Sequence, residues 1–280
     1  MALQWPSNLS VYLCFRPKFN KIYRKTTLIA KTSFSNVYDC VSDTNSDLIV
    51  KIQNPFANSI SIHNEVRILQ NLHDVSNVAS LVYAEVGLCT SYLVFEKIHG
   101  LPLNKYMKMH PDTNKKVLVN QLLQVYKNIQ QKHINHRDIK FDNILIERCD
   151  AEPGFKIHII DFGMSVCQSD LHKCEHNEVA GTYQFQCPEM YRGMYYNGSC
   201  DTWSFGVLVY MIFFCKAPYI IKKREIQHCH TFHMIPQQMQ VVRSTLAAVK
   251  TNIMRDYLLQ MFVFNQKKRP LLKDLNILRL

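Results

Sequence analysis

Hydrophobic residues in the first hundred positions are arranged mostly as in β-strands. Between Leu28 and Val41 apolar residues alternate with turn-forming residues, which predicts a β-hairpin. Leu48–Ile52 is a short run rich in β-branched residues, and positions 78–95 have the composition of two further strands. One stretch, residues 62–69, instead repeats its apolar residues at helical spacing. This part of the chain is therefore predicted to be a sheet with one helix.

Beyond residue 100 the apolar positions mostly follow the period of helices. One face of a predicted helix is marked by Leu118, Leu122, Val125 and Ile129. Asn143–Ile146 and Lys156–Ile160 predict two short strands, with a turn between them. The apolar, uncharged stretch Thr202–Cys215 is too short to cross a bilayer. We therefore expect a buried helix there and no membrane association.

The composition is that of a globular protein with a basic surface. The 280 residues are 47% hydrophobic, enough for a sizeable core in one large domain or two lobes. Lys and Arg number 33 against 22 Asp and Glu, which favours anionic partners such as nucleotides. These charges are spread along the chain, as in a solvated surface, and no recognised nucleic-acid motif accompanies them. Direct nucleic-acid binding is therefore not expected.

The cysteines point to a reducing compartment. Ten are scattered without a repeated spacing, and no cleavable signal sequence is recognisable, so we expect a location in the cytoplasm or nucleus. The densest groups of potential zinc ligands are Cys167, His172, Cys174 and His176, and then His228, Cys229, His230 and His233. The first group matches no zinc module, and the second fits a surface helix. A zinc site is therefore not expected.

Chemically distinctive residues gather in one octet, His136–Asn143, with the sequence H-R-D-I-K-F-D-N. The octet resembles the catalytic loop of protein kinases, which implies that Asp138 accepts the proton of an incoming hydroxyl and that Lys140 neutralises a phosphoryl group during its transfer. Asn143 can hold a metal ion. Phosphoryl transfer depends mainly on positioned charge, so this set suits that reaction. The alternative interpretation is a polar turn after a helix.

Three charged residues elsewhere add to this octet. Lys51 is the single charge of its predicted strand. Glu65 lies beside the inward-facing apolar positions of the helix over residues 62–69, where a carboxylate needs a cation. Asp161 begins the tripeptide D-F-G directly after a predicted strand.

In sequence order, these features resemble the signatures of eukaryotic-type protein kinases from Tyr23 to the C-terminus. The matching positions are Lys51, Glu65, His136–Asn143, Asp161–Gly163, Pro188–Glu189, Asp201 and Arg269. The resemblance implies an α+β, two-lobed protein kinase fold, with a small β-rich N-lobe containing one helix and a larger, mainly helical C-lobe. It implies an N-terminal extension over residues 1–24 and a kinase domain over 25–280, divided into N-lobe (25–96), hinge (96–100) and C-lobe (101–280).

The resemblance also implies a role for each matching residue. ATP and Mg²⁺, which Mn²⁺ could replace, would be the cofactors, with Asn143 and Asp161 as metal ligands. Lys51, fixed by Glu65, would hold the non-transferred phosphates. Asp138 would orient and deprotonate a Ser or Thr hydroxyl, and Lys140 would stabilise the transferring group. The other implied cofactor-binding positions are Ala30, Val37, Glu96 and Ile98, and the implied structural contacts are Asp201 to the catalytic loop and Arg269 to Glu189.

The phosphate-covering loop of the family is the one serious departure. Ile29–Val37 has its length, but Ala30, Thr32 and Ser35 replace all of its glycines. We expect a stiffer loop that weakens ATP binding without abolishing it. The alternative is a pseudokinase, a nucleotide- or protein-binding module without turnover.

Substrate and control are indicated by single residues. Lys140 resembles serine/threonine kinases, and Asp142 lies where kinases that prefer basic peptides carry an acidic residue, so basic or arginine-rich protein substrates are expected. Arg137 matches an arginine that binds a loop phosphate. Between Gly163 and Gly181 the only hydroxyl residues are Ser165 and Ser169, whereas the carboxylates are Asp170, Glu175 and Glu178. We therefore expect activity without loop phosphorylation, with one carboxylate replacing the phosphate.

Three matters stay open at the level of sequence. The compact size and diverged loop resemble kinases encoded by large insect DNA viruses, such as baculoviruses. Residues 1–24 mix basic and aromatic side chains and could dock on the protein, bind a partner or be partly disordered. Neither the physiological substrate nor the oligomeric state follows from the sequence.

Overall fold

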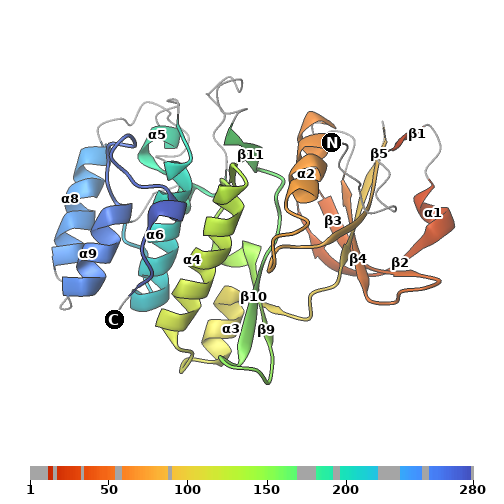
Figure 1. The fold of residues 1–280 in the computed structure, drawn as a ribbon, viewed down its shortest axis with the longest axis horizontal. Helices are drawn as coiled ribbons and strands as arrows, with labels where there is room; N and C mark the ends of the chain where they lie inside the picture. Colours follow the sequence, from red (N-terminus) through yellow and green to blue (C-terminus); the bar gives the residue numbers. More distant parts are fainter. Residues whose placement is uncertain are drawn as a thin grey trace. The chain divides into compact units, whose positions relative to one another are not determined.

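A computed structural model gives the fold (Figure 1). The structure describes residues 12–14, 18–32, 35–53, 59–87, 90–168, 181–191, 196–219, 234–247 and 252–278. The chain divides into two compact units, the first comprising Met1–His99 and Ile160–Gly163, and the second Gly100–Ile159 and Met164–Leu280. The chain therefore passes between the units three times, after His99, after Ile159 and after Gly163.

The first unit is built on a six-stranded sheet with the order β1-β5-β6-β4-β3-β2. Its strands are β1 (Tyr12–Cys14), β2 (Tyr23–Lys31), β3 (Ser35–Ser42), β4 (Leu48–Gln53), β5 (Leu81–Gly87) and β6 (Ser91–Glu96). β1 pairs with β5 in parallel, and all other pairs are antiparallel. The predicted hairpin is confirmed as β2 and β3, and the two strands predicted over 78–95 are confirmed as β5 and β6.

The helix predicted over residues 62–69 is confirmed as α2 (Ser59–Asn71), which packs against β5. Ile62, Val66 and Leu69 are buried, as their spacing predicted. Glu65 lies on the same side and is only 1% exposed. The apolar face of α2 thus carries a carboxylate into the interior of the first unit.

A short helix, α1 (Phe19–Ile22), attaches the N-terminal segment to the sheet. Its backbone N–H groups at Lys18 and Phe19 donate to the buried carboxylate of Glu85 on β5, at 2.9 and 2.8 Å, and the hydroxyl of Tyr83 donates to it at 2.9 Å. The Phe19 ring is fully buried and stacks on Tyr92, with ring centroids 4.4 Å apart. Of the alternatives left open for residues 1–24, docking on the protein therefore holds for the described residues, 12–14 through β1 and 18–24 through α1 and the start of β2.

The second unit is mainly helical, so the α+β fold class is confirmed. Its helices are α3 (Leu103–Met109), α4 (Lys115–Gln131), α5 (Pro188–Tyr191), α6 (Ser199–Phe214), α8 (Met234–Ala247) and α9 (Asn252–Met261). Its strands are β7 (Leu101–Pro102), β8 (Ile134–Asn135), β9 (Ile144–Arg148), β10 (Phe155–Ile159) and β11 (Val166–Cys167). They form a three-stranded sheet, β10-β9-β7, and the pair β11-β8.

Two helices predicted from apolar patterns form the core of the second unit. Asn114 caps the N-terminus of α4, because its side chain accepts a hydrogen bond from the N–H of Val117, and α4 buries the whole predicted apolar face. α6 corresponds to the uncharged stretch and is buried along almost its full length, between α4 and α9 (Figure 1). None of the described helices combines the length and apolar character that a membrane span requires.

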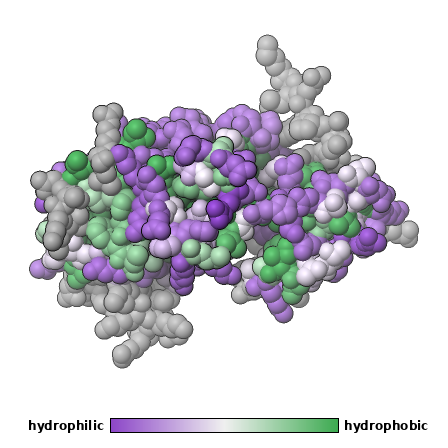
Figure 2. Space-filling view, turned by 90° about the horizontal axis from the view of Figure 1, so that it is seen from below, coloured by the Kyte–Doolittle hydropathy of each residue, from purple (hydrophilic) through white to green (hydrophobic). Residues whose placement is uncertain are grey.

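The surface of the second unit is not uniformly polar. Val241 on α8 and Ile253 and Leu259 on α9 are 40–56% exposed. In Figure 2 hydrophobic residues gather at the left, at the end of the second unit that carries these helices. Elsewhere on this face, hydrophilic residues predominate.

Candidate active site

The first unit contains an ammonium between two carboxylates. Lys51 Nζ, in the middle of β4, lies 2.7 Å from Glu65 Oε1 and 2.9 Å from Asp161 Oδ1. Burial alone would lower the pKa of Lys51, but the two carboxylates outweigh it, so this pKa is raised above its ordinary value. Lys51 is therefore a fixed positive charge, and its predicted pairing with Glu65 is confirmed.

Asp161 remains accessible although it is part of this cluster. Its side chain is 47% exposed, whereas the side chain of Glu65 is 1% exposed. The Asp161 backbone has φ +61°, a left-handed conformation that is uncommon outside glycine. At Gly163, a Cβ atom would lie 3.4 Å from both Asp161 Oδ1 and Glu65 Oε2. An accessible carboxylate beside an ammonium is a donor set that suits a metal-bound phosphate.

In the second unit, Asp201 on α6 holds the backbone of the catalytic octet. Its carboxylate accepts hydrogen bonds from the N–H groups of His136 and Arg137, at 2.7 and 2.8 Å. Asp201 is 1% exposed, and burial raises its pKa, although these hydrogen bonds and the neighbouring His136 favour the ionised form. The predicted contact between Asp201 and this loop is confirmed.

Asp138 is the centre of the octet's hydrogen bonds. Its Oδ1 accepts from the N–H and the hydroxyl of Thr182, both at 3.0 Å. Its Oδ2 accepts from Lys140 Nζ at 2.7 Å and from Asn143 Nδ2 at 3.0 Å. Four donors hold this carboxylate in one orientation. The arrangement can therefore aim a hydroxyl group and later take its proton.

The Lys140 ammonium and the Asn143 amide carbonyl can each interact with a further partner. Lys140 also donates to the Thr182 hydroxyl at 3.0 Å, so the ammonium is held next to Asp138. The Nδ2 of Asn143 donates to the backbone and side chain of Asp138, which directs the amide carbonyl away from them. Amide oxygens ligate Mg²⁺, so Asn143 fits a metal ligand.

Thr182 contacts the candidate catalytic residue Asp138, a contact that was not predicted from the sequence. The available signal was the dipeptide Gly181-Thr182 shortly before Pro188–Glu189. Gly181 has φ +82°, and a Cβ atom there would collide with the carbonyl oxygen of Arg137. The glycine therefore lets the backbone approach the catalytic octet closely enough for Thr182 to reach Asp138.

The remaining predicted nucleotide-binding positions all lie in the first unit. Ala30 and Val37 are cross-strand partners on β2 and β3. Glu96 ends β6 and donates its N–H to the carbonyl of Ser80 at 3.1 Å, and Ile98 follows in the irregular segment before Gly100. Their role in binding a nucleotide remains a prediction.

The turn that lacks glycines is closed by its own hydroxyl groups. Thr32 donates its N–H to the carbonyl of Ser35 at 2.8 Å, and the N–H of Ser35 donates to Thr32 Oγ1 at 3.0 Å. The two hydroxyls also lie 3.1 Å apart. Two backbone N–H groups of this turn are thus already engaged within it.

Arg137 has partners other than a phosphate. Its Nη1 donates to the hydroxyl of Tyr196 at 2.6 Å, and its Nε donates to the carbonyl of Met164. The proposed substitutes for a phosphate, Asp170, Glu175 and Glu178, lie outside the described residues, as does Ser169. That part of the expectation therefore stays a prediction.

Arg269 and Glu189 form the predicted ion pair. The guanidinium donates to Oε1 at 2.5 Å and to Oε2 at 3.0 Å, with both side chains buried. Arg269 further donates to the carbonyls of Val263 and Ser199. The pair ties the segment after α9 to α5.

The zinc ligands considered from sequence lie mostly beyond the described residues, which include only Cys167 of the two groups. Where the structure describes the chain, no group of three or more His, Cys, Asp or Glu side chains is arranged to hold a metal ion. Six of the described cysteines form no disulfide: Cys40, Cys149, Cys167, Cys187, Cys200 and Cys215.

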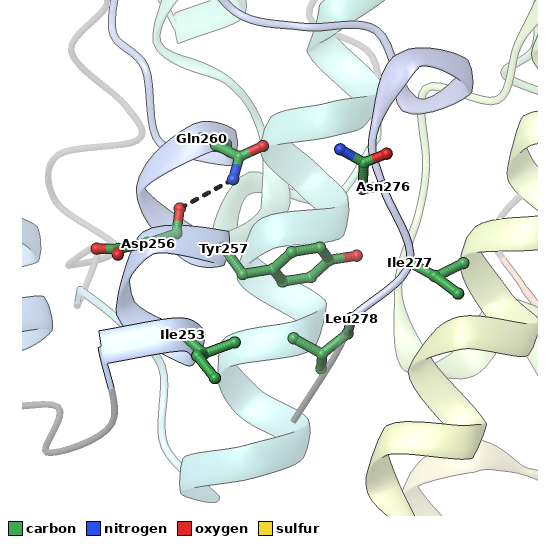
Figure 3. Close-up of a pocket in the computed structure, with 7 residues that line it drawn as sticks. All are labelled: Ile253, Asp256, Tyr257, Gln260, Asn276, Ile277 and Leu278. Carbon is green, nitrogen blue, oxygen red and sulfur yellow. Dashed lines mark hydrogen bonds between the residues drawn. The ribbon is translucent and has the colours of Figure 1, made fainter.

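Two pockets lie within the second unit. One, of about 460 Å³, borders the catalytic octet and is lined by Phe141, Asp142, Lys108 and Lys115, among others. The other, of about 360 Å³, lies between α9 and the segment over residues 276–278 (Figure 3). The Tyr257 ring lies across it, and its hydroxyl has no hydrogen-bond partner among the described residues.

Comparison with known proteins agrees with this geometry. The chain is 32% identical to mouse serine/threonine-protein kinase D3 over 170 residues, which are 59% of this chain and 18% of the relative. It is 27% identical to MAP kinase-interacting serine/threonine-protein kinase 1 of Xenopus tropicalis over 222 residues, which are 74% of this chain and 53% of the relative. The matches thus span about a fifth to about a half of these relatives' length. The family model of the protein kinase domain matches residues 23–276, and the chain belongs to that family.

Proposed function

We propose that the chain is a serine/threonine protein kinase, which transfers the γ-phosphoryl group of ATP to hydroxyl groups of proteins. The observation that carries this proposal is the Asp138 carboxylate, held by four donors from Lys140, Asn143 and Thr182. A buried structural carboxylate needs partners, but it does not need an ammonium that is itself held by a second group. Such positioned charge is what phosphoryl transfer requires of a protein.

Each residue has one task in this mechanism. Asp138 aligns the substrate hydroxyl for attack on the γ-phosphorus and takes its proton as the new P–O bond forms and ADP leaves. Lys140 stabilises the negative charge on the transferring group. Lys51, kept charged by Glu65, binds the non-transferred phosphates. Asn143 and Asp161 would hold Mg²⁺, which neutralises phosphate oxygens when bound.

The test is transfer of radiolabel from ATP with Mg²⁺ to a panel of acidic and basic proteins, followed by phosphoamino-acid analysis. The proposal expects label on Ser or Thr, and loss of that label in Asp138→Asn. Absence of transfer by a folded protein that binds ATP would refute the proposal.

For substrates, we propose that a single basic side chain is recognised at Asp142. The Asp142 carboxylate is exposed, with one hydrogen bond of 3.5 Å from Asn104. Lys108 and Lys115 line the same pocket, so an extended run of arginines would meet repulsion there. The proposal therefore narrows the expected basic or arginine-rich substrates to those with one basic side chain near the acceptor. Peptide arrays should show a preference for one Lys or Arg near the acceptor, and Asp142→Ala should remove it. A preference unchanged in that variant would refute this assignment.

One observation favours a pseudokinase as the second candidate function. The N–H groups of Thr32 and Ser35 are engaged within their own turn and are thus unavailable for phosphates in this arrangement. A pseudokinase would bind a fluorescent ATP analogue or a protein partner without transferring phosphate. The same protein preparation therefore distinguishes the two functions.

A further inference from the structure

A buried glutamine lies directly beside the charged cluster of the first unit. Gln53 is two residues beyond Lys51 on β4, so both side chains project from the same face of the strand. It is 7% exposed, and its Nε2 donates to Glu65 Oε2 at 3.0 Å. β4 is a central strand, paired at this position with Ser35 on β3 and Ser91 on β6. The amide is therefore presented from a rigid element.

The two oxygens of Glu65 have different partners. Oε1 accepts from Lys51 at 2.7 Å, and Oε2 accepts from Gln53 at 3.0 Å. A carboxylate bound through one oxygen can still rotate about its last bond, but one bound through both oxygens cannot. Gln53 therefore fixes the direction in which Glu65 presents Oε1 to Lys51.

The other half of the Gln53 amide shows that stability alone does not explain this residue. Its Oε1 is buried without a hydrogen-bond partner among the described residues. Turning the amide over would place this oxygen against the carboxylate of Glu65 and remove the existing bond. An apolar side chain of similar size would leave no stranded oxygen. The presence of an amide at this position is thus explained by its Nε2 group, which donates a hydrogen bond to Glu65.

We propose that Gln53 is a positioning residue, which acts through Glu65 to set the place of the Lys51 ammonium for nucleotide phosphates. This inference rests on the proposed kinase function. The chain of contacts from Gln53 to Glu65, Lys51 and Asp161 lies entirely within the first unit.

The main test replaces the amide with an apolar side chain of similar shape, Gln53→Met. The value of kcat/KM for ATP should fall about tenfold, as expected for loss of one hydrogen bond to a charged group. The KM for the protein substrate should not change. The control is Gln130→Met, because Gln130 is similarly buried but its amide contacts only the second unit: Nε2 donates to the carbonyl of Gly198 and to Asn135 Oδ1, and Oε1 accepts from the N–H of Lys273. An equal loss in the control, or no loss in Gln53→Met, would overturn the inference.

A second variant, Gln53→Glu, supplies a pH profile that a purely structural role would not produce. When protonated, the new carboxyl group can donate to Glu65 as the amide does, so kcat/KM relative to wild type should approach one at acidic pH. When it ionises beside Glu65, repulsion should lower that ratio as pH rises. Glu65 contacts this position directly, and Lys51 and Asp161 follow it in the same chain of contacts. A ratio independent of pH would count against the proposal.

Binding of a fluorescent ATP analogue with Mg²⁺ separates this inference from the proposed function. If wild type binds the analogue but transfers no phosphate, the kinase proposal fails. The positioning role of Gln53 is then tested by comparing the dissociation constants of the analogue for Gln53→Met and for wild type. A tenfold weaker Gln53→Met would then support the positioning role, and equal affinity would refute it. If wild type binds no nucleotide, both proposals are overturned.

Discussion

The guanidinium of Arg137 donates a hydrogen bond of 2.6 Å to the hydroxyl of Tyr196, and both residues are 7% exposed. Burial raises the pKa of Tyr196 to about 12, although Arg137 opposes the rise, so the hydroxyl stays protonated at neutral pH. Arg137 precedes Asp138 in the chain, and its backbone is held by Asp201. The arginine is thus anchored by a tyrosine from within the second unit.

We expect Tyr196→Phe to weaken this anchor, because a hydrogen bond to a charged group is lost. Unfolding free energy should fall by about 1.5–3 kcal/mol, measured by denaturant titration. The matched control is Tyr257→Phe, whose hydroxyl has no partner in the described part of the chain and whose removal should not destabilise the protein.

Wild type should remain active after phosphatase treatment. Phosphate at Ser169 together with inactivity after that treatment would contradict this expectation.

Asp138→Asn should remove most turnover while leaving nucleotide binding intact. The amide retains the shape of the carboxylate but cannot take a proton, and general base catalysis contributes about 10²–10⁴ in rate. The measurement is kcat alongside the dissociation constant of an ATP analogue. Asp142→Asn, two residues past Lys140, is the control and should retain kcat on substrates without basic residues. Equal kcat values for Asp138→Asn and wild type would rule out the mechanism.

Restoring glycines at Ala30, Thr32 and Ser35 should improve ATP binding. The change frees the Ser35 N–H from Thr32 and permits a closer backbone approach, so KM for ATP should fall about five- to thirtyfold. The thermal midpoint should fall slightly, because glycine gains entropy on unfolding. Ser42→Gly is the control, since Ser42 closes another turn of the same sheet by accepting from the N–H of Asn45. An unchanged or higher KM in the triple variant would exclude a weakened phosphate clamp.

The buried pair of Arg269 and Glu189 should be sensitive to the loss of either partner. Glu189→Gln leaves an uncompensated buried cation, so unfolding free energy should fall by about 3–5 kcal/mol. Arg269→Met should cost more, because it also strands the carbonyls of Val263 and Ser199. Asp256→Asn, which removes an exposed pair with Arg255 at 3.6 Å, should change stability by less than about 1 kcal/mol. Similar losses in the exposed and buried pairs would contradict this account.

His158 on β10 should make stability depend on pH. Burial and the neighbouring Lys156 lower its pKa below the ordinary value, against the opposing effect of Glu147. The unfolded chain therefore binds a proton first as pH falls through about 6.5, and stability is lost until the folded-state pKa is passed. Titrating unfolding free energy from neutral to acidic pH should show a smaller decline in His158→Gln. An identical decline in both proteins would refute the assignment.

Sequence patterns predicted the elements that carry the site because charge and burial left few alternatives. Glu65 lies on an apolar helix face, and the only nearby cation of the predicted strand was Lys51, so their pairing followed from the need to compensate a buried charge. The D-F-G tripeptide after β10 and the octet after β8 were assigned by their order in the chain.

Contacts between distant backbones could not be predicted in the same way. Thr182 reaches Asp138 because Gly181 approaches the carbonyl of Arg137, and no periodicity encodes such an approach. The proposed role of Gln53 rests on a detail that the sequence does not encode. Lys51 contacts Oε1 of Glu65, and this leaves Oε2 to accept from the Gln53 amide. The Arg137–Tyr196 contact joins residues 59 positions apart, and only the fold shows that they meet.

The anchoring of α1 by Glu85 bears on the order in which the protein can form during its synthesis. Lys18 and Phe19 leave the ribosome 67 and 66 residues before Glu85, the carboxylate that receives their N–H groups. Contacts so distant in sequence require closure of a long loop and form late in folding. The contacts between α1 and Glu85 therefore form only after β5 has been made, whereas β2, β3 and β4 can already pair with one another. In a nascent chain, the segment around Lys18 and Phe19 is made before the strand that carries Glu85, yet it would be among the last parts of its unit to reach its final place.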